Sequence, residues 1–101
     1  MTLYTPRGYH ELMNENVKKQ AIRRLKIAGG QVRGLERMLE EDKYCIDIIH
    51  QSLATKRALS SFENLILENH LSTHAIEQIN SGKKRKAVND ILSIYKLYGQ
   101  K

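Results

Sequence analysis

The sequence predicts an all-α fold. Proline occurs once, at Pro6, and neither glycine nor proline occurs between Gly34 and Gly82. Over this stretch, apolar residues recur at steps of three and four, the period of a helix that buries one face. Residues that break helices are therefore scarce where the helical period is strongest. With 101 residues, the chain has room for one domain.

The first predicted helix follows a flexible N-terminal arm, residues 1–15, which has no sustained period. Asn14 or Asn16 is suited to cap this helix, because a short polar side chain accepts hydrogen bonds from the free N–H groups of the first turn. From Val17 onward, apolar residues mark one face: Leu25, Ala28, Val32, Leu35 and Leu39. Glycines in this run lower helix propensity and indicate close backbone packing against a neighbour: Gly29, Gly30 and Gly34.

The second predicted helix runs from about residue 44 to residue 80, and Asp42 is suited to cap it. Glycine in the segment 80–82 is a favoured stop signal. A short third helix then follows the basic run 83–86 and ends near Gly99. Residues 16–101 are thus predicted to form a single domain of three helices, which are long, long and short.

The length of the second helix predicts an oligomer. Some 36 residues span about 54 Å at 1.5 Å per residue, which exceeds the width of a compact domain of this size. One chain cannot cover the apolar face of such a helix. We therefore expect an antiparallel four-helix-bundle dimer and, by pairing of dimers, a homotetramer.

The charge of the chain favours a polyanionic partner, nucleic acid first. Seventeen Lys and Arg residues against eleven Asp and Glu residues give a net charge of +6. Phosphate binding needs cations on a connected surface. Two helices carry the candidates: Lys18, Lys19, Arg23, Arg24, Lys26 and Arg33 on the first, Lys56 and Arg57 on the second. The basic run 83–86 either adds contacts or only solubilises a turn.

Composition also indicates the cellular compartment and argues against a membrane protein or an enzyme. Cys45 is the only cysteine, so no intrachain disulfide forms and a reducing cytoplasm is expected. No signal-peptide core and no membrane-length apolar stretch is present, which predicts no membrane partner. Because no nucleophile–base pair or paired carboxylate set is evident, we expect neither an enzyme nor a small organic substrate.

Three side chains are candidate metal ligands: Cys45, His70 and His74. The histidines are four residues apart and project from one helix face, where they either share a metal or serve as ordinary polar residues. Cys45 precedes His70 by 25 residues, about 37 Å along a helix. One chain therefore cannot close the site. If two second helices pair antiparallel, Cys45 of one chain comes level with the histidines of the other.

Two sequence runs also carry a family resemblance. RLKIAGGQVRGL at 24–35 and MLEEDKYCIDI at 38–48 closely resemble the metal-sensing repressors called CsoR and RcnR, and with the two histidines the resemblance covers residues 17–98. It implies three-helix protomers that form dimers of dimers and lack a helix-turn-helix. It also implies that the metal-free protein binds operator DNA and that metal binding releases it, which derepresses metal efflux genes. Cys45 of one protomer and His70 and His74 of the next would be the ligands.

The resemblance implies roles for three further residues. Tyr44 matches a position beside the metal site, and Asp90 falls near a carboxylate that holds a ligand imidazole. Arg24 matches a basic position that is linked to operator binding. The alternatives are a half-buried aromatic residue for Tyr44 and a solvated charge for Asp90.

The number and type of donor atoms in the candidate site indicate which metal it would bind. One thiolate and two imidazoles suit three-coordinate Cu(I), although the copper sensors more often have cysteine at the position of His74. Ni(II) or Co(II) needs more nitrogen and oxygen ligands, and His10 is the only candidate in the arm. We rank Cu(I) first, Ni(II) and Co(II) second and Zn(II) below both. A DNA-binding helical module without a sensor role is the remaining alternative.

Overall fold

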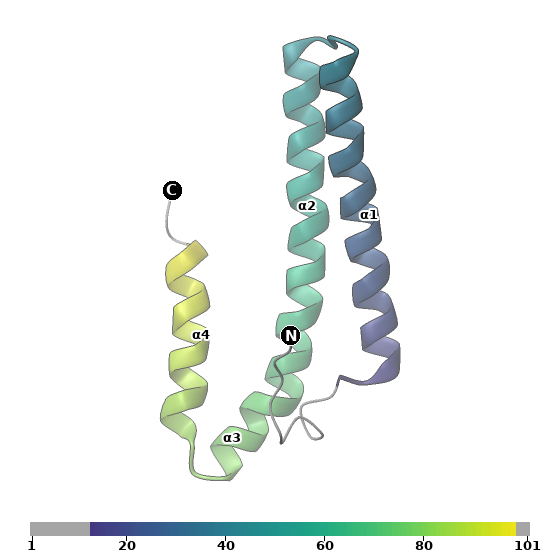
Figure 1. Ribbon diagram of the computed structural model, residues 1–101. Helices are drawn as coiled ribbons and strands as arrows, with labels where there is room; N and C mark the ends of the chain where they lie inside the picture. The colour runs from purple at the N-terminus through teal and green to yellow at the C-terminus, as the bar shows by residue number, and fades with distance from the viewer. Residues whose placement is uncertain (1–12, 99–101) are drawn as a thin grey trace. The chain divides into compact units, whose positions relative to one another are not determined.

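The computed structural model describes residues 13–98, and these residues form only helices and turns. The elements are α1 (Glu15–Glu40), α2 (Cys45–His70), the π-helical turn η2 (Leu71–Ala75), α3 (Ile76–Asn80) and α4 (Lys84–Tyr98) (Figure 1). The helical backbone is continuous from residue 45 to residue 80, as predicted for the second helix. The all-α, three-helix prediction is therefore confirmed. The chain divides into two compact units between Leu67 and Glu68, which are described in turn.

Asn14 is the N-cap of α1. Its side-chain oxygen accepts hydrogen bonds from the backbone N–H groups of Asn16 at 2.7 Å and Val17 at 3.4 Å. Its carbonyl accepts the N–H of Lys18 at 2.9 Å. Of the two predicted caps, Asn14 is therefore the correct one. Residues 1–12 of the predicted arm lie outside the described residues.

Asp42 ends α1 and does not cap α2, which corrects the prediction. Its φ of 54° lies in the left-handed region. The Lys43 N–H donates to the Met38 carbonyl at 2.9 Å, and the Asp42 N–H donates to the Leu39 carbonyl at 3.2 Å. These bonds form a Schellman motif, in which the left-handed position tolerates a short polar residue. The carbonyl of Tyr44 accepts the first hydrogen bond of α2, so Tyr44 takes the N-cap position.

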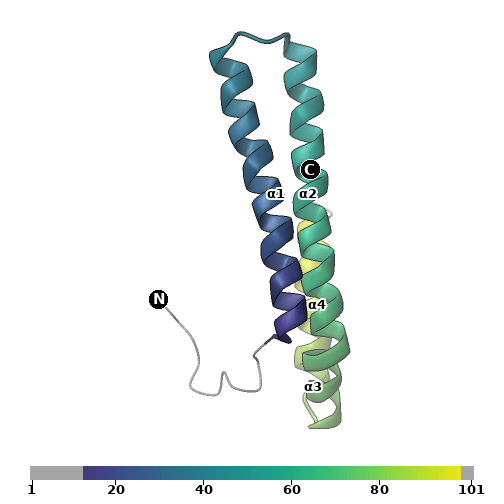
Figure 2. The same cartoon turned by 90° about the vertical axis from the view of Figure 1, so that its right-hand side faces the viewer.

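Helices α1 and α2 form an antiparallel hairpin in the first unit (Figures 1 and 2). Arg24 Nη1 donates to the Ser61 carbonyl at 2.8 Å, and Gln51 Nε2 donates to the Gln31 carbonyl at 3.4 Å. The buried residues of these helices are small: Ala21, Ala28 and Thr55. The fully buried positions of the hairpin are thus small, and polar contacts to backbone carbonyls join the two helices.

The glycines of α1 do not approach another backbone within the chain, contrary to expectation. A Cβ placed on Gly34 would lie 3.5 Å from Gln51 Nε2, an ordinary van der Waals contact. The nearest atoms to such a Cβ on Gly29 or Gly30 belong to the Arg33 guanidinium, at 3.5 and 3.8 Å. Among the described helices, therefore, no neighbour requires glycine at these positions.

Apolar side chains of the hairpin remain exposed. Leu25, Val32 and Leu39 recur every seven residues along α1, and each is at least 41% exposed. A second stripe on α2 is exposed to a similar degree: Ile46, Ile49 and Leu53. Within residues 13–98, no large side chain is fully buried. Contiguous exposed apolar surface of this kind is typical of a protein–protein interface.

The second unit contains η2, α3 and α4, with Ala75 and Ala87 buried. The π-helical turn widens the backbone, and two hydroxyl groups donate hydrogen bonds to carbonyls of the preceding turn. Ser72 Oγ donates to the Glu68 carbonyl at 2.8 Å, and the Thr73 hydroxyl makes the equivalent bond to Asn69 at 2.7 Å. Among the described helices, none has the length and apolar character needed to span a membrane.

Gly82 forms the predicted stop between α3 and α4. Its φ is 86°, and the Lys83 N–H donates to the Gln78 carbonyl at 2.7 Å in a second Schellman motif. Helix α4 begins at Lys84, so the run 83–86 belongs mostly to the helix and does not precede it.

We expect Gly82→Ala to lower the free energy of unfolding by about 1 kcal/mol, because a Cβ is unfavourable at positive φ. Urea unfolding at a fixed protomer concentration, followed by circular dichroism, measures the change. Asn80→Ala, at the exposed end of α3, is the control and should change stability by less than about 0.5 kcal/mol. Equal values for the two variants would contradict the role of Gly82.

Candidate functional site

His70 and His74 lie together in the second unit. His70 ends α2, His74 is in η2, and their ring centroids are 5.5 Å apart with the ring planes at 69°. His70 Nε2 is buried and has no hydrogen-bond partner in the structure. A buried imidazole nitrogen without a partner is unfavourable, and coordination of a metal ion would satisfy it. The pair therefore fits a metal site.

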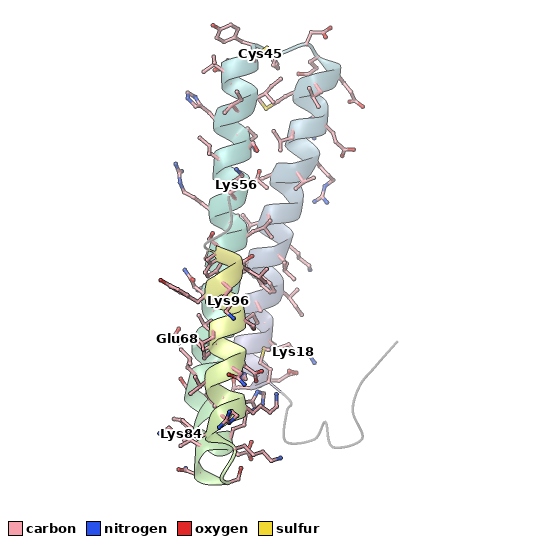
Figure 3. All side chains as sticks on the ribbon, turned by 90° about the vertical axis from the view of Figure 1, so that its left-hand side faces the viewer. Lys18, Cys45, Lys56, Glu68, Lys84 and Lys96 are labelled. Carbon is pink, nitrogen blue, oxygen red and sulfur yellow. The ribbon has the colours of Figure 1, made fainter. Side chains whose placement is uncertain are left out.

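Cys45 is at the other end of α2 (Figure 3). It is the first residue of the helix, and its free thiol is exposed. Within residues 13–98, no three His, Cys, Asp or Glu side chains are grouped so that they could hold a metal ion. The chain by itself thus brings together two of the three predicted ligands. Cys45 does not join the two histidines within the described residues.

The structure shows how exposed Tyr44 is and which residue Asp90 contacts. Tyr44 is 69% exposed in the single chain. Asp90 Oδ2 accepts a hydrogen bond from Lys86 Nζ at 3.0 Å, in an ion pair along one face of α4. The roles of Tyr44 and Asp90 beside a metal stay predictions. His50 is an exposed residue of α2, and His10 lies outside the described residues.

Five of the six basic residues predicted on α1 share one side of the helix. At 100° per residue they fall within a sector of about 140°, and all are exposed: Lys18, Lys19, Arg23, Lys26 and Arg33. We call these five residues the α1 stripe. Lys56 and Arg57 on α2 are exposed as well. Among the described residues, no acidic side chain pairs with any of these seven, so their charges are available to a polyanion.

Arg24 lies apart from the α1 stripe. It shares the inner face of α1 with the buried residues Ala21 and Ala28, and its guanidinium donates to the Ser61 carbonyl of α2. Arg24 is three residues after Ala21 and four residues before Ala28, and residues at these spacings share one face of a helix. The sequence spacing therefore already indicates this shared face. Arg24 therefore links the two helices of the hairpin, whatever else it contacts.

Sequence reasoning missed two polar partners. Ser61, the acceptor for Arg24, had no sequence signal, because a backbone carbonyl accepts from any side chain that the fold brings near. From the sequence, Lys86 is assigned only to the basic run 83–86. Its spacing of four residues from Asp90 was the signal for their ion pair.

We expect Arg24→Ala to lower the free energy of unfolding by about 1–2 kcal/mol, since it leaves a part-buried carbonyl without its charged donor. Arg23→Ala is the matched control, because Arg23 is exposed, and it should cost less than about 0.5 kcal/mol. Urea unfolding at one protomer concentration compares them. If both variants were equally stable, Arg24 would not link the helices.

The described residues thus combine a helical scaffold, exposed basic side chains and an imidazole pair. Comparison with known families gives the class of protein: residues 17–96 match the model of the metal-sensitive transcriptional repressors. The chain belongs to this family. The family consists of transcriptional repressors, so the protein is not an enzyme.

Known relatives agree with this assignment. The copper-sensing transcriptional repressor CsoR of Bacillus subtilis (strain 168) is 34% identical over 92 residues, which cover 88% of this chain and 91% of the relative. The copper-sensing transcriptional repressor RicR of Mycobacterium tuberculosis is 40% identical over 83 residues, which cover 79% and 86%. The resemblance predicted from the sequence is confirmed.

A solved structure agrees as well. The crystal structure of the copper-sensing repressor CsoR with Cu(I) from Geobacillus thermodenitrificans NG80-2 has a TM-score of 0.76 to this chain. The two chains are 27% identical, and the match covers 99% of this chain and 95% of the other. The helical fold therefore has a known counterpart.

Proposed function

We propose that this protein is a cytoplasmic, copper-responsive repressor. The metal-free form binds operator DNA, and Cu(I) binding releases it, which derepresses metal efflux genes. Two relatives and one solved structure are described as copper-sensing. One thiolate and two imidazoles also form a donor set that suits Cu(I).

The proposed metal site is shared between protomers. Cys45 of one protomer joins His70 and His74 of another, because these residues stand at opposite ends of the α2–η2 segment. The observation that carries this proposal is the buried, unpartnered Nε2 of His70 beside the ring of His74. When bound, the metal supplies a link between protomers.

The exposed apolar stripes support the assembly that such a site needs. The stripe on α1, containing Val32, and the stripe on α2, containing Ile49, leave apolar surface that a second hairpin would cover. Burial of one isoleucine side chain is worth about 1.5–3 kcal/mol. We infer an antiparallel four-helix-bundle dimer, and a homotetramer formed from two dimers.

The α1 stripe, together with Lys56 and Arg57, would bind the phosphates of the operator. These exposed cations have no acidic partner among the described residues, and a symmetric assembly repeats them. Arg24 would support this surface by holding α1 against α2. Its resemblance to a basic position of the family adds a direct DNA contact as a further proposal.

Metal binding and DNA binding would be coupled because Cys45 and the α1 stripe belong to one hairpin. Cys45 begins α2, which packs against the helix that carries the α1 stripe. Tyr44 and Asp90 would lie beside the ligands, and Asp90 would exchange its contact with Lys86 for a ligand imidazole. A change in how protomers are joined alters the spacing of their basic stripes. Such coupling is typically worth about 1–3 kcal/mol, or roughly 5–150-fold in affinity.

An anaerobic titration tests the proposal. The reduced protein is bound to a labelled promoter fragment from its own locus, and Cu(I) or Ni(II) is added while fluorescence anisotropy is recorded. Release at about one Cu(I) per protomer supports the proposal. Release by Ni(II) alone would assign the protein to nickel or cobalt and make His10 a ligand. No response to either metal would favour a DNA-binding module without a sensor role.

A further inference from the structure

We propose that Lys83, Lys84 and Arg85, here called the basic turn, form a second DNA-contacting surface. The basic turn belongs to the second compact unit, whereas the α1 stripe belongs to the first. This inference rests on the proposed function and extends it, because it assigns part of the operator contact to the unit that contains the two histidines.

The charges of the basic turn are unpaired. Residues 83–86 are four consecutive cations, and all are exposed. Lys86 is paired with Asp90 at 3.0 Å. Within the described part of the chain, no carboxylate lies within ion-pair distance of Lys83, Lys84 or Arg85. Three positive charges at adjacent positions therefore have no counter-charge beside them.

The backbone that presents these charges is well anchored. The Lys83 N–H donates to the Gln78 carbonyl at 2.7 Å, and the Lys83 carbonyl accepts the Ala87 N–H at 3.1 Å. Lys84 and Arg85 occupy the first turn of the 15-residue helix α4. The backbone thus loses little entropy on binding a ligand, in contrast to a basic segment that has to fold first.

In the protein without a ligand, the cations of the basic turn stand at an electrostatically unfavourable position, the start of α4. The first turn of α4 contains no acidic residue, and cations near a helix N-terminus are repelled by the helix dipole and by one another. A polyanion removes this repulsion by neutralising the charges and releases its own counterions. DNA is the polyanion that a repressor must contact, and the α1 stripe has the same sign, so DNA is favoured over an acidic protein.

The test compares two double variants with the same change in net charge. Lys84→Gln/Arg85→Gln neutralises part of the basic turn. Lys43→Gln/Lys96→Gln is the control: Lys43 lies in the turn after α1, and Lys96 lies near the other end of α4 from Lys84 (Figure 3). Binding of the metal-free proteins to the labelled promoter fragment and to an unrelated fragment is measured by anisotropy over a range of salt concentrations.

We expect the basic-turn variant to bind about tenfold more weakly near 0.1 M salt for each phosphate that it no longer neutralises. The slope of log affinity against log salt should fall in magnitude by about 0.9 for each such phosphate. Both fragments should be affected alike, because phosphate contacts carry no sequence information. The control variant should match the parent chain. Circular dichroism and the Cu(I) stoichiometry should be the same for all three proteins.

Three results would overturn the inference. Parental affinity and salt slope in the basic-turn variant would show that these charges serve another partner or only solubility. Equal losses of affinity in both double variants would reflect net charge alone. If the parent chain itself failed to bind its promoter, the proposed function would fall and this inference with it, whereas the first two results leave the proposed function intact.

Discussion

Cys45→Ala is expected to abolish copper-induced release of operator DNA and to leave the affinity of the metal-free protein for DNA unchanged. The thiol is exposed at the first position of α2, and alanine is a good helix former, so the fold should tolerate the change. Without the thiolate, the two histidines of one protomer would no longer be linked to the next. The release factor should fall from roughly 5–150 to about one.

Anisotropy with and without Cu(I) measures this factor. His50→Ala is the matched control, because it removes an exposed imidazole of the same helix that has no part in the proposed site, and its release should equal that of the parent. If Cys45→Ala abolished DNA binding by the metal-free protein, Cys45 would be needed for structure or DNA contact and would not act in the response.

A mixture of defective chains tests whether the site is shared. Cys45→Ala lacks the thiolate, and His70→Ala/His74→Ala lacks both imidazoles, so neither protein alone should bind Cu(I) at the site. In an antiparallel dimer of the two, one site keeps all three ligands. Random pairing should restore about a quarter of the parental sites. No recovery after unfolding and joint refolding would refute a site built from two protomers.

Ile49→Glu is expected to dissociate the assembly. Ile49 is 53% exposed in the single chain, so a glutamate there costs that chain little. In a four-helix bundle the same position would be covered, and an unpaired carboxylate would be buried at each copy of the interface. We expect the mass measured by sedimentation velocity to fall to that of smaller species, with a loss of DNA affinity.

The control for this prediction introduces glutamate one position along. His50→Glu changes an exposed polar residue on the neighbouring side of α2 and should keep the parental mass. An unchanged mass for Ile49→Glu would place the interface elsewhere. Comparison at several protomer concentrations is needed, because association depends on concentration.

Local sequence signals predicted the helices and most of their ends. The apolar period, an asparagine cap at residue 14 or 16 and the Gly82 stop depend on residues within one or two turns of each other. The structure confirms the helices and the stop, and it selects Asn14 as the cap. The prediction for Asp42 was wrong. An aspartate suits both a helix N-cap and a left-handed residue, and only the hydrogen bonds to Met38 and Leu39 distinguish the two.

The sequence by itself determined the fold class, the family, the basic charge and the three candidate ligands, since each depends on residue type and on spacing along one helix. The tertiary structure decided which of these residues act together. It placed the Arg24 guanidinium against the Ser61 carbonyl of α2, and it left His70 Nε2 buried beside His74. Such pairings depend on helix rotation and on packing between segments, which a helical period alone leaves undetermined.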